Sequence, residues 1–440
     1  MRNTATMSRM RCAAALAALL MVCAAAPQGL RLQAQSRVKP DDVGLSSERL
    51  KRLSTALNGY VKDEKLAGGV LLVARRGKVA YVEAFGQRDR ESRSPMREDT
   101  LFRIASQSKA LVSTAVLMLQ EEGRLLISDP VGKYLPEFRQ TTVAVARPGG
   151  GYDVVKAKRP ITIRDLLTHT SGVGYGGGVA GDKWEKGGIT GWYFADRDEP
   201  IAATVSRMAA LPFDAQPGEQ WVYGYNTDIL GALAERVSGQ PLDELLRTRI
   251  LVPLGMNDTH FYVPESKKER LATVYSINAA GRLERTPDQG GMVSQGAYVA
   301  GPKKSFSGGA GLISTASDYG RFLQMMLNGG ELEGKRLLSR KTVELMTTNH
   351  LHGVRTDGGG GIGIDFDGLG FGLGFSVVTD LGARGIPGSV GEFGWGGAYH
   401  SSYWVDPKEQ LVVVYLTQLL PAGDVDDHAK MRALLYQALE

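Results

Sequence analysis

Cysteine is scarce in this sequence. Cys12 and Cys23 are the two cysteines among 440 residues, and both lie within the first 34. If that segment is removed by processing, the mature chain has no thiol for a disulfide, a cysteine nucleophile or a thiolate metal site. The chemistry of the mature protein is therefore expected to depend on other side chains.

Acidic residues are absent from the start of the chain as far as Asp41. Arginines begin the sequence instead, and the apolar run that follows, 12–26, is short for a bilayer span. This pattern is typical of a secretory signal peptide, predicted here at 1–34. We expect the mature protein to be periplasmic or secreted, with no stable membrane span after processing. An uncleaved anchor is the alternative, and cleavage either after Ala34 or nearer Ala25 fits.

A strong excess of charge is also missing once this leader is set aside. The full chain has a net charge of +5. The leader holds four of the 52 basic residues and none of the 47 acidic ones, so its removal leaves about +1. This balance gives no reason to expect nucleic acid as a partner. The expected partner is a small-molecule ester or amide, and the oligomeric state stays open.

Several common catalytic and metal-binding signatures are missing as well. No Gly-x-Ser-x-Gly occurs, so the nucleophile elbow of α/β-hydrolases is not supported. No His-Glu-x-x-His is present, and the pair at 350–352 is too little for a metal site. The glycine-rich stretches 172–178 and 357–374 lack a strand–GxGxxG–helix context. We therefore expect no cofactor and no metal.

The periodicity of apolar residues predicts strands near both ends of the chain. Short alternating or apolar runs bounded by turn residues occur at 70–73, 79–82, 401–405 and 411–416. Helical spacing predicts helices at 45–61 and 426–440, and several more in the middle of the chain.

This distribution predicts an α+β fold with an antiparallel sheet flanked by helices. Residues 36–105 and 301–440 are expected to form the sheet domain. Residues 106–300 are expected to form a mainly helical domain inserted between them. A ligand site is expected in the cleft between the two.

A Ser-x-x-Lys motif begins a predicted helix at Ser106 and Lys109. Three residues make nearly one helical turn, so the hydroxyl and the amine lie on the same face. A lysine with a lowered pKa can accept the proton of an attacking serine. The helix N-terminus favours a developing oxyanion. A second match, Ser36 to Lys39, lies beside the leader with Pro40 following and is assigned no function.

The context of Ser106 resembles the serine β-lactamase and D-alanyl-D-alanine carboxypeptidase superfamily. Phe-Arg-Ile-Ala precedes the serine and a long apolar helix follows it. Further similar stretches lie at 166–172, 253–256 and 307–315. The chain is most similar to class C β-lactamases and to family VIII carboxylesterases. The resemblance covers nearly all of the mature chain and implies the β-lactamase/transpeptidase-like fold.

The resemblance also implies a catalytic tyrosine. Its spacing from Pro217-Gly218, and from the Asp-Ile-Leu-Gly that follows, gives this role to Tyr223. Tyr225 stands where β-lactamases have asparagine and is expected to contact substrate, with a catalytic role as the minority alternative. Either tyrosine could instead be a packing aromatic. Which of Lys109 and Tyr223 is the main base is left open.

A third element of the family, Lys-Thr-Gly, is replaced here by Trp395-Gly396-Gly397. The resemblance implies that this segment lines the site, where two glycines let substrate approach the strand closely. The lysine of the family helps to hold a substrate carboxylate. An indole in its place favours neutral esters, unless Trp395 is a core residue of an edge strand.

The resemblance further implies an oxyanion hole formed by the backbone N–H groups of Ser106 and Ala398. His400, two residues beyond, is expected to contact substrate. The resulting hypothesis is a serine hydrolase that forms an acyl-enzyme on Ser106, most simply a carboxylesterase. The alternatives are a β-lactamase or D-alanyl-D-alanine carboxypeptidase or related D-amino-peptidase, and a catalytically inactive binding module of the same fold.

Overall fold

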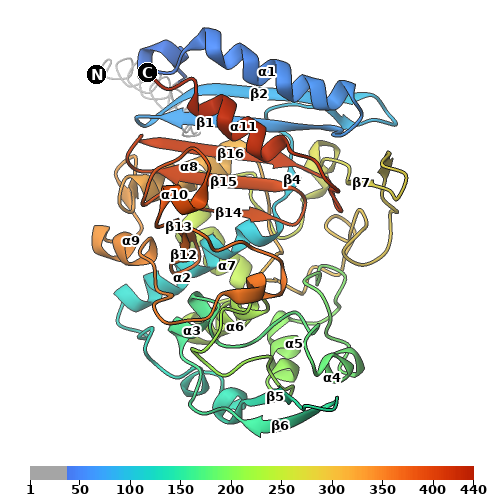
Figure 1. The fold of residues 1–440 in the computed structure, drawn as a ribbon, viewed down its shortest axis with the longest axis vertical. Helices are drawn as coiled ribbons and strands as arrows, with labels where there is room; N and C mark the ends of the chain where they lie inside the picture. Colours follow the sequence, from blue (N-terminus) through green and yellow to red (C-terminus); the bar gives the residue numbers. More distant parts are fainter. Residues whose placement is uncertain (1–36) are drawn as a thin grey trace, which may run out of the picture. The chain divides into compact units, whose positions relative to one another are not determined.

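An eight-stranded antiparallel sheet forms the centre of the computed structural model, which describes residues 37–440 (Figure 1). Its strand order is β12-β13-β14-β15-β16-β1-β2-β3. The strands are β1 (Gly68–Arg75), β2 (Lys78–Asp89), β3 (Ser94–Pro95), β12 (Leu369–Phe371), β13 (Ser376–Val378), β14 (Phe393–Gly397), β15 (Ser401–Asp406) and β16 (Leu411–Thr417). Because β1 pairs with β16, strands from the two ends of the chain meet in the middle of the sheet.

Both central strands are apolar along their whole length because both faces of the sheet are covered. Every residue of β1 and β16 is buried. One face, which includes Leu71 and Val413, packs with α1 (Ser47–Lys62) and α11 (Asp427–Tyr436), as Figure 1 shows. On the other face, residues such as Leu72 belong to the core that includes α8 (Ala316–Leu327) and α2 (Ser108–Glu121).

Helix α2 is buried on all sides. Residues 108–119 are all buried, so solvent reaches this helix chiefly at its C-terminal end. A helix that is apolar all round belongs to the interior of a protein. It packs against α6 (Asn226–Ser238) and α7 (Leu242–Leu246).

The segment between the two halves of the sheet is mainly helical. Its other elements are short, and two hairpins occur where helices were expected to dominate. The helices are α3 (Ile163–Leu167), α4 (Gly181–Lys186) and α5 (Ile201–Met208), and the hairpin strands are β5 (Thr142–Ala146), β6 (Tyr152–Lys156), β7 (Tyr275–Ile277) and β8 (Leu283–Arg285). The remaining small elements are β4 (Phe102–Arg103), β9 (Ile313–Ser314), β10 (Glu331–Leu332), β11 (Lys335–Arg336), α9 (Arg340–Met346) and α10 (Leu381–Arg384).

The predicted α+β architecture, an antiparallel sheet flanked by helices with a mainly helical insertion, is confirmed. The described residues cluster by contacts into one compact unit, 37–440. The predicted leader at 1–34 lies outside the described residues. Within 37–440, no helix combines the length and apolar character needed to cross a bilayer.

Candidate active site

Ser106 lies on a short 3-10 turn, Ala105–Gln107, that leads directly into α2. The preceding Ala105 has a φ of +42°, a conformation that L-residues other than glycine rarely adopt. Ser106 is partly exposed although its neighbours on both sides are buried. Backbone strain of this kind concentrates at functional sites, and here it brings one hydroxyl to the surface of a cavity.

The amine of Lys109 is buried and makes three short polar contacts. Its Nζ donates to Ser106 Oγ at 3.1 Å, to Tyr175 Oη at 3.1 Å and to the carbonyl of Gly309 at 2.7 Å. The structure therefore joins the serine and the lysine of the Ser-x-x-Lys motif, as their helical spacing predicts.

Asp228 holds the loop that supplies one of these contacts. Its carboxylate accepts hydrogen bonds from Ser307 Oγ at 2.6 Å and from the Gly309 N–H at 3.1 Å. Burial raises the pKa of Asp228, while these hydrogen bonds and the charge of Lys109 act in the opposite direction. The acid thus positions the Gly309 carbonyl on the lysine without bonding to the amine itself.

Tyr175 is a site residue that the sequence did not predict. It lies in the glycine-rich loop 172–178, three residues after one of the stretches that resemble the family. Burial, and next the charges that Tyr223 and Asp228 can carry, hold the pKa of Tyr175 well above its ordinary value of 10.0. Its phenol is therefore protonated at neutral pH, and it accepts a hydrogen bond from Lys109 while keeping a proton to donate.

Tyr223 contacts the same lysine through its ring. Lys109 Nζ lies 4.6 Å from the ring centroid, within the range of a cation–π interaction. The Tyr223 hydroxyl accepts a hydrogen bond from Trp395 Nε1 at 2.9 Å. The structure thus places Tyr223 beside Lys109, with its hydroxyl directed to the tryptophan of the Trp-Gly-Gly segment.

The ring of His169 packs against the ring of Tyr223. Its ring centroid lies 4.7 Å from that of Tyr223, and its Nδ1 lies 2.9 Å from Asn226 Nδ2. Burial, reinforced by the charge of Lys109, lowers the pKa of His169 well below 6.5. The histidine is therefore neutral, and its contacts are those of a packing residue within its loop.

Strand β14 brings the Trp-Gly-Gly segment next to Ser106. A Cβ on Gly397 would lie 2.4 Å from the carbonyl oxygen of Ile104, so only glycine allows this approach. Ser106 and Ala398 both line the cavity. Among residues 37–440, no acceptor takes the backbone N–H of either one. An oxyanion hole requires two such donors close together.

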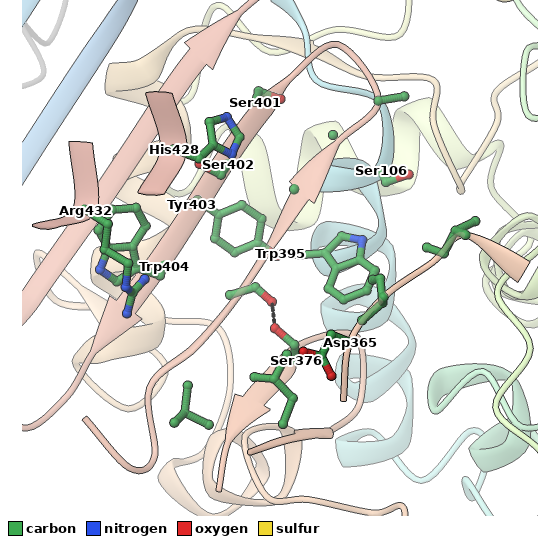
Figure 2. Close-up of a pocket in the computed structure, with 18 of the residues that line it drawn as sticks. Ser106, Asp365, Ser376, Trp395, Ser401, Ser402, Tyr403, Trp404, His428 and Arg432 are labelled. Carbon is green, nitrogen blue, oxygen red and sulfur yellow. Dashed lines mark hydrogen bonds between the residues drawn. The ribbon is translucent and has the colours of Figure 1, made fainter. Parts of the chain in front are cut away.

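The cavity beside Ser106 has a volume of about 830 Å³. Figure 2 shows Ser106 on one side of it, Arg432 on the opposite side and Trp395 between them. Apolar side chains make up much of the wall: Ile362, Ile364, Leu369, Val378, Ile386 and Met431. Such a volume and lining are usual for a small-molecule site.

Tyr225 and His400, the other two residues expected to contact substrate, lie outside this lining. Tyr225 is fully buried, donates to the Gly191 carbonyl at 2.8 Å and stacks on Trp184. His400 is directed to Asp427, with Nε2 2.6 Å from Oδ1. Trp395, Gly396 and Gly397 do line the cavity.

Several known proteins are similar to this chain. A family model described as Beta-lactamase matches residues 53–438. Protein Rv1367c of Mycobacterium tuberculosis (strain ATCC 25618 / H37Rv) is 37% identical over 369 residues, or 82% of this chain and 88% of that protein. Esterase EstB of Burkholderia gladioli is 34% identical over 390 residues, or 84% of this chain and 91% of that protein. The solved structure of EstCE1, described as a hydrolase with promiscuous acyltransferase activity, has a TM-score of 0.73 and 28% identity, and covers 88% of this chain and 99% of that one.

Proposed function

Because the chain belongs to the Beta-lactamase family of serine hydrolases, we propose that it is a carboxylesterase that forms an acyl-enzyme on Ser106. The observation that supports this most strongly is the position of Lys109 Nζ, 3.1 Å from Ser106 Oγ at the wall of a largely apolar cavity. A serine attacks a carbonyl only when a nearby base takes its proton, and the lysine is close enough to do so.

The contacts of Lys109 define how it can act as that base. A neutral amine has two N–H groups and one lone pair. The N–H groups can stay on the Gly309 carbonyl and on Tyr175 Oη, which leaves the lone pair for the proton of Ser106. The ring of Tyr223 then stabilises the ammonium that results.

The reaction proceeds in two steps. Ser106 Oγ bonds to the ester carbonyl carbon, and the N–H groups of Ser106 and Ala398 stabilise the oxyanion. The C–O bond to the alcohol breaks, and the alcohol leaves with the proton first taken from Ser106. Water then attacks the acyl carbon and gives up a proton to the same base. The bond between that carbon and Ser106 Oγ breaks, the acid is released, and Ser106 Oγ takes the proton back.

The relay of the proton to the leaving alcohol is assigned to a tyrosine. The family resemblance implies Tyr223, and the hydrogen bond to Lys109 adds Tyr175 to the proposed set. Both side chains line the cavity together with Ser106. A phenol in hydrogen-bond reach of the reacting groups typically contributes about 10²–10⁴ in rate.

A neutral ester suits this cavity better than a carboxylate-bearing amide. Trp395 lines the wall at the position where the Lys-Thr-Gly branch of the family has its cation. Aliphatic side chains line much of the same wall. A substrate carboxylate beside Trp395 would meet an indole in place of a cation and would lose hydration at a cost. The arginines of the lining are Arg384 and Arg432, and Arg432 is already paired with Glu392. We therefore propose esters as the substrates, in preference to β-lactams or D-alanyl peptides.

Comparison of two chromogenic substrates tests this proposal. We expect turnover of p-nitrophenyl butyrate by the wild-type protein to exceed turnover of nitrocefin by at least about 100-fold in kcat/KM. A preference for nitrocefin would place the protein on the β-lactamase side. Absence of turnover of either substrate would leave a binding module of the same fold.

Export of the protein is proposed on the sequence of its leader. The arginine start, the apolar run and the small residues that follow are typical of a cleaved signal peptide. The N-terminal sequence of the protein recovered from a bacterial periplasm or medium should begin between about residues 26 and 35. Recovery with Met1 intact would contradict export by cleavage.

A further inference from the structure

The loop that carries the proposed oxyanion donor contains a histidine in an unusual backbone conformation. Residues 398–400 connect β14 to β15, and Gly397 pairs with Ser401 across the hairpin. Three-residue hairpin loops commonly end on a residue in the left-handed region, where glycine is preferred. Here that residue is His400, with a φ of +58°. A side chain at such a position suggests a reason other than the turn itself.

The side chain of His400 ties this loop to helix α11. Its Nε2 lies 2.6 Å from Oδ1 of Asp427, the first residue of that helix. The Asp427 side chain is fully buried, and its second oxygen accepts a hydrogen bond from Tyr415 Oη at 2.7 Å. The ring of His428 stacks on that of His400 with centroids 4.2 Å apart.

His400, Asp427 and His428 also have their ligand-type atoms within 4.8 Å of one another, which is close enough to consider a metal ion. However, each oxygen of Asp427 already has a donor from the protein. Burial acts to raise the pKa of Asp427, but the hydrogen bonds of His400 and Tyr415 and the neighbouring imidazoles together lower it. A charged carboxylate held by two donors accounts for the arrangement as a hydrogen-bonded set.

The loop is also held by β16, the strand that pairs with β15. Thr417 Oγ1 donates to the carbonyl of Tyr399 at 3.1 Å and also to that of His400. The N–H of Leu419 donates to the Tyr399 carbonyl at 3.2 Å. Residues of β16 and of the segment after it thus hold the carbonyls of Tyr399 and His400 in place. Helix α11 holds the side chain of His400. Within residues 37–440, the Ala398 N–H has no acceptor.

We infer that the His400–Asp427 hydrogen bond is a positioning device that holds the Ala398 N–H in place for the oxyanion. His400 is a positioning residue in this account, because it acts through the loop and does not line the cavity. The inference rests on the proposed esterase function. An oxyanion donor contributes only when it is fixed in the geometry of the transition state, so a loop free to move would lose most of the benefit.

Replacement of His400 by glycine separates this role from that of a simple turn residue. Glycine fits the left-handed conformation better than histidine, so the turn itself is preserved. We expect His400→Gly to lower kcat on p-nitrophenyl butyrate by about tenfold or more, with KM within about threefold of wild type. His400→Asn, which also tolerates this conformation but has a shorter side chain, should behave alike.

Arg76→Gly is the matched control, because Arg76 has a φ of +52° in the exposed turn between β1 and β2. It should leave kcat and KM unchanged. If the wild-type protein is active and both His400 variants keep its kcat, the positioning role is wrong. A change in KM without a change in kcat would also contradict it.

Unfolding of both His400 variants would also overturn the inference, in favour of a purely structural function for the histidine. An inactive wild-type protein would instead contradict the proposed esterase function. The two failures are therefore distinguishable.

Discussion

Lys109 Nζ lies 3.1 Å from the hydroxyl of Tyr175, a residue 66 positions further along the chain. The same amine contacts Ser106, so one buried amine joins the serine before the first helical turn to a phenol from a distant loop. A serine, a lysine and a tyrosine in mutual contact form a route along which one proton can move without solvent.

The first prediction concerns the nucleophile and its base. Ser106→Ala and Lys109→Ala should each lower kcat on p-nitrophenyl butyrate by about 10³-fold or more. The first variant has lost the proposed nucleophile and the second its base, and neither residue can do the work of the other. Ser402→Ala is the matched control, since Ser402 lines the same cavity from β15. It should retain kcat within about threefold. Comparable losses in all three variants would contradict the assignment of Ser106.

Tyr175 gives a second prediction. Removal of its hydroxyl takes away one of the three contacts of Lys109 Nζ, so Tyr175→Phe should lower kcat by about 10²-fold or more. Tyr262→Phe is the control, because the Tyr262 hydroxyl bonds to the carbonyls of Ala195 and Ser305 away from the cavity. Steady-state kinetics gives kcat for both variants, and Tyr262→Phe should keep the wild-type value. A Tyr175→Phe enzyme with wild-type kcat would remove this residue from the proposed set.

The close approach of β14 to the nucleophile leads to a third prediction. A methyl group on Gly397 would lie 2.4 Å from the Ile104 carbonyl, so Gly397→Ala must push the strand or the Ser106 turn aside. We expect a loss of about 1–3 kcal/mol in the free energy of unfolding, together with a lower kcat. Gly149→Ala, where the added methyl meets nothing within 4 Å, should change neither. Denaturant titration measures the free energy of unfolding, and steady-state kinetics measures kcat. A Gly397→Ala protein equal to wild type in both quantities would contradict the prediction.

Asp214 gives a prediction about pH. Burial raises the pKa of Asp214 from 3.8 to about 6, although the Gly174 N–H bonds to the carboxylate and lowers the value in part. One carboxylate oxygen, Oδ1, is buried without a partner among the described residues. A carboxyl with a higher pKa in the folded chain binds its proton more tightly there. The contribution of Asp214 to stability should therefore fall as pH rises from about 4 to about 6 and change little above.

Asp214→Asn removes this titration. At pH 7 the variant should unfold at a higher temperature than wild type, by the equivalent of about 2–3 kcal/mol, and at pH 4 the two should be equal. Thermal unfolding followed at several pH values measures this difference. A Tm difference that does not depend on pH would show that Asp214 is not the group responsible.

Much of the site follows from local sequence rules. Ser106 and Lys109 are three residues apart at the start of a helix, so their contact depends only on helical geometry. The runs at 70–73 and 411–416 are apolar enough to predict central strands, and β1 and β16 include them. The helix predicted at 45–61 corresponds to α1, which begins at Ser47 and ends at Lys62.

Other parts of the site depend on contacts between distant segments. The backbone N–H of Asp214 donates to the Gly172 carbonyl at 2.8 Å. This hydrogen bond holds the glycine-rich loop against the core, and Tyr175 of that loop therefore contacts Lys109. A Cβ on Gly174 or Gly178 would lie about 2 Å from the Asp214 carboxylate, at 2.2 and 1.9 Å, so this packing requires glycine. No period or motif in the sequence encodes such a long-range fit.

Two residues that follow a motif by two positions, Tyr225 and His400, lie outside the cavity wall. Tyr225 follows Tyr223 but belongs to the turn that begins α6, and its side chain packs against Trp184 away from Ser106. His400 follows Ala398 in a loop of three residues, where the chain reverses and directs the histidine to α11. The direction of a side chain in a turn depends on the backbone angles of that turn. The number of residues between the side chain and a motif does not give these angles.

The most direct test of the central claim is the mass of the intact mature protein after exposure to a fluorophosphonate probe, followed by peptide mapping. Such a probe phosphonylates an activated serine by expelling fluoride. The account predicts one adduct per chain, located on the peptide that contains Ser106, and no adduct on Ser106→Ala. An adduct on another residue, or an unmodified wild-type protein, would contradict the account of Ser106 as the nucleophile.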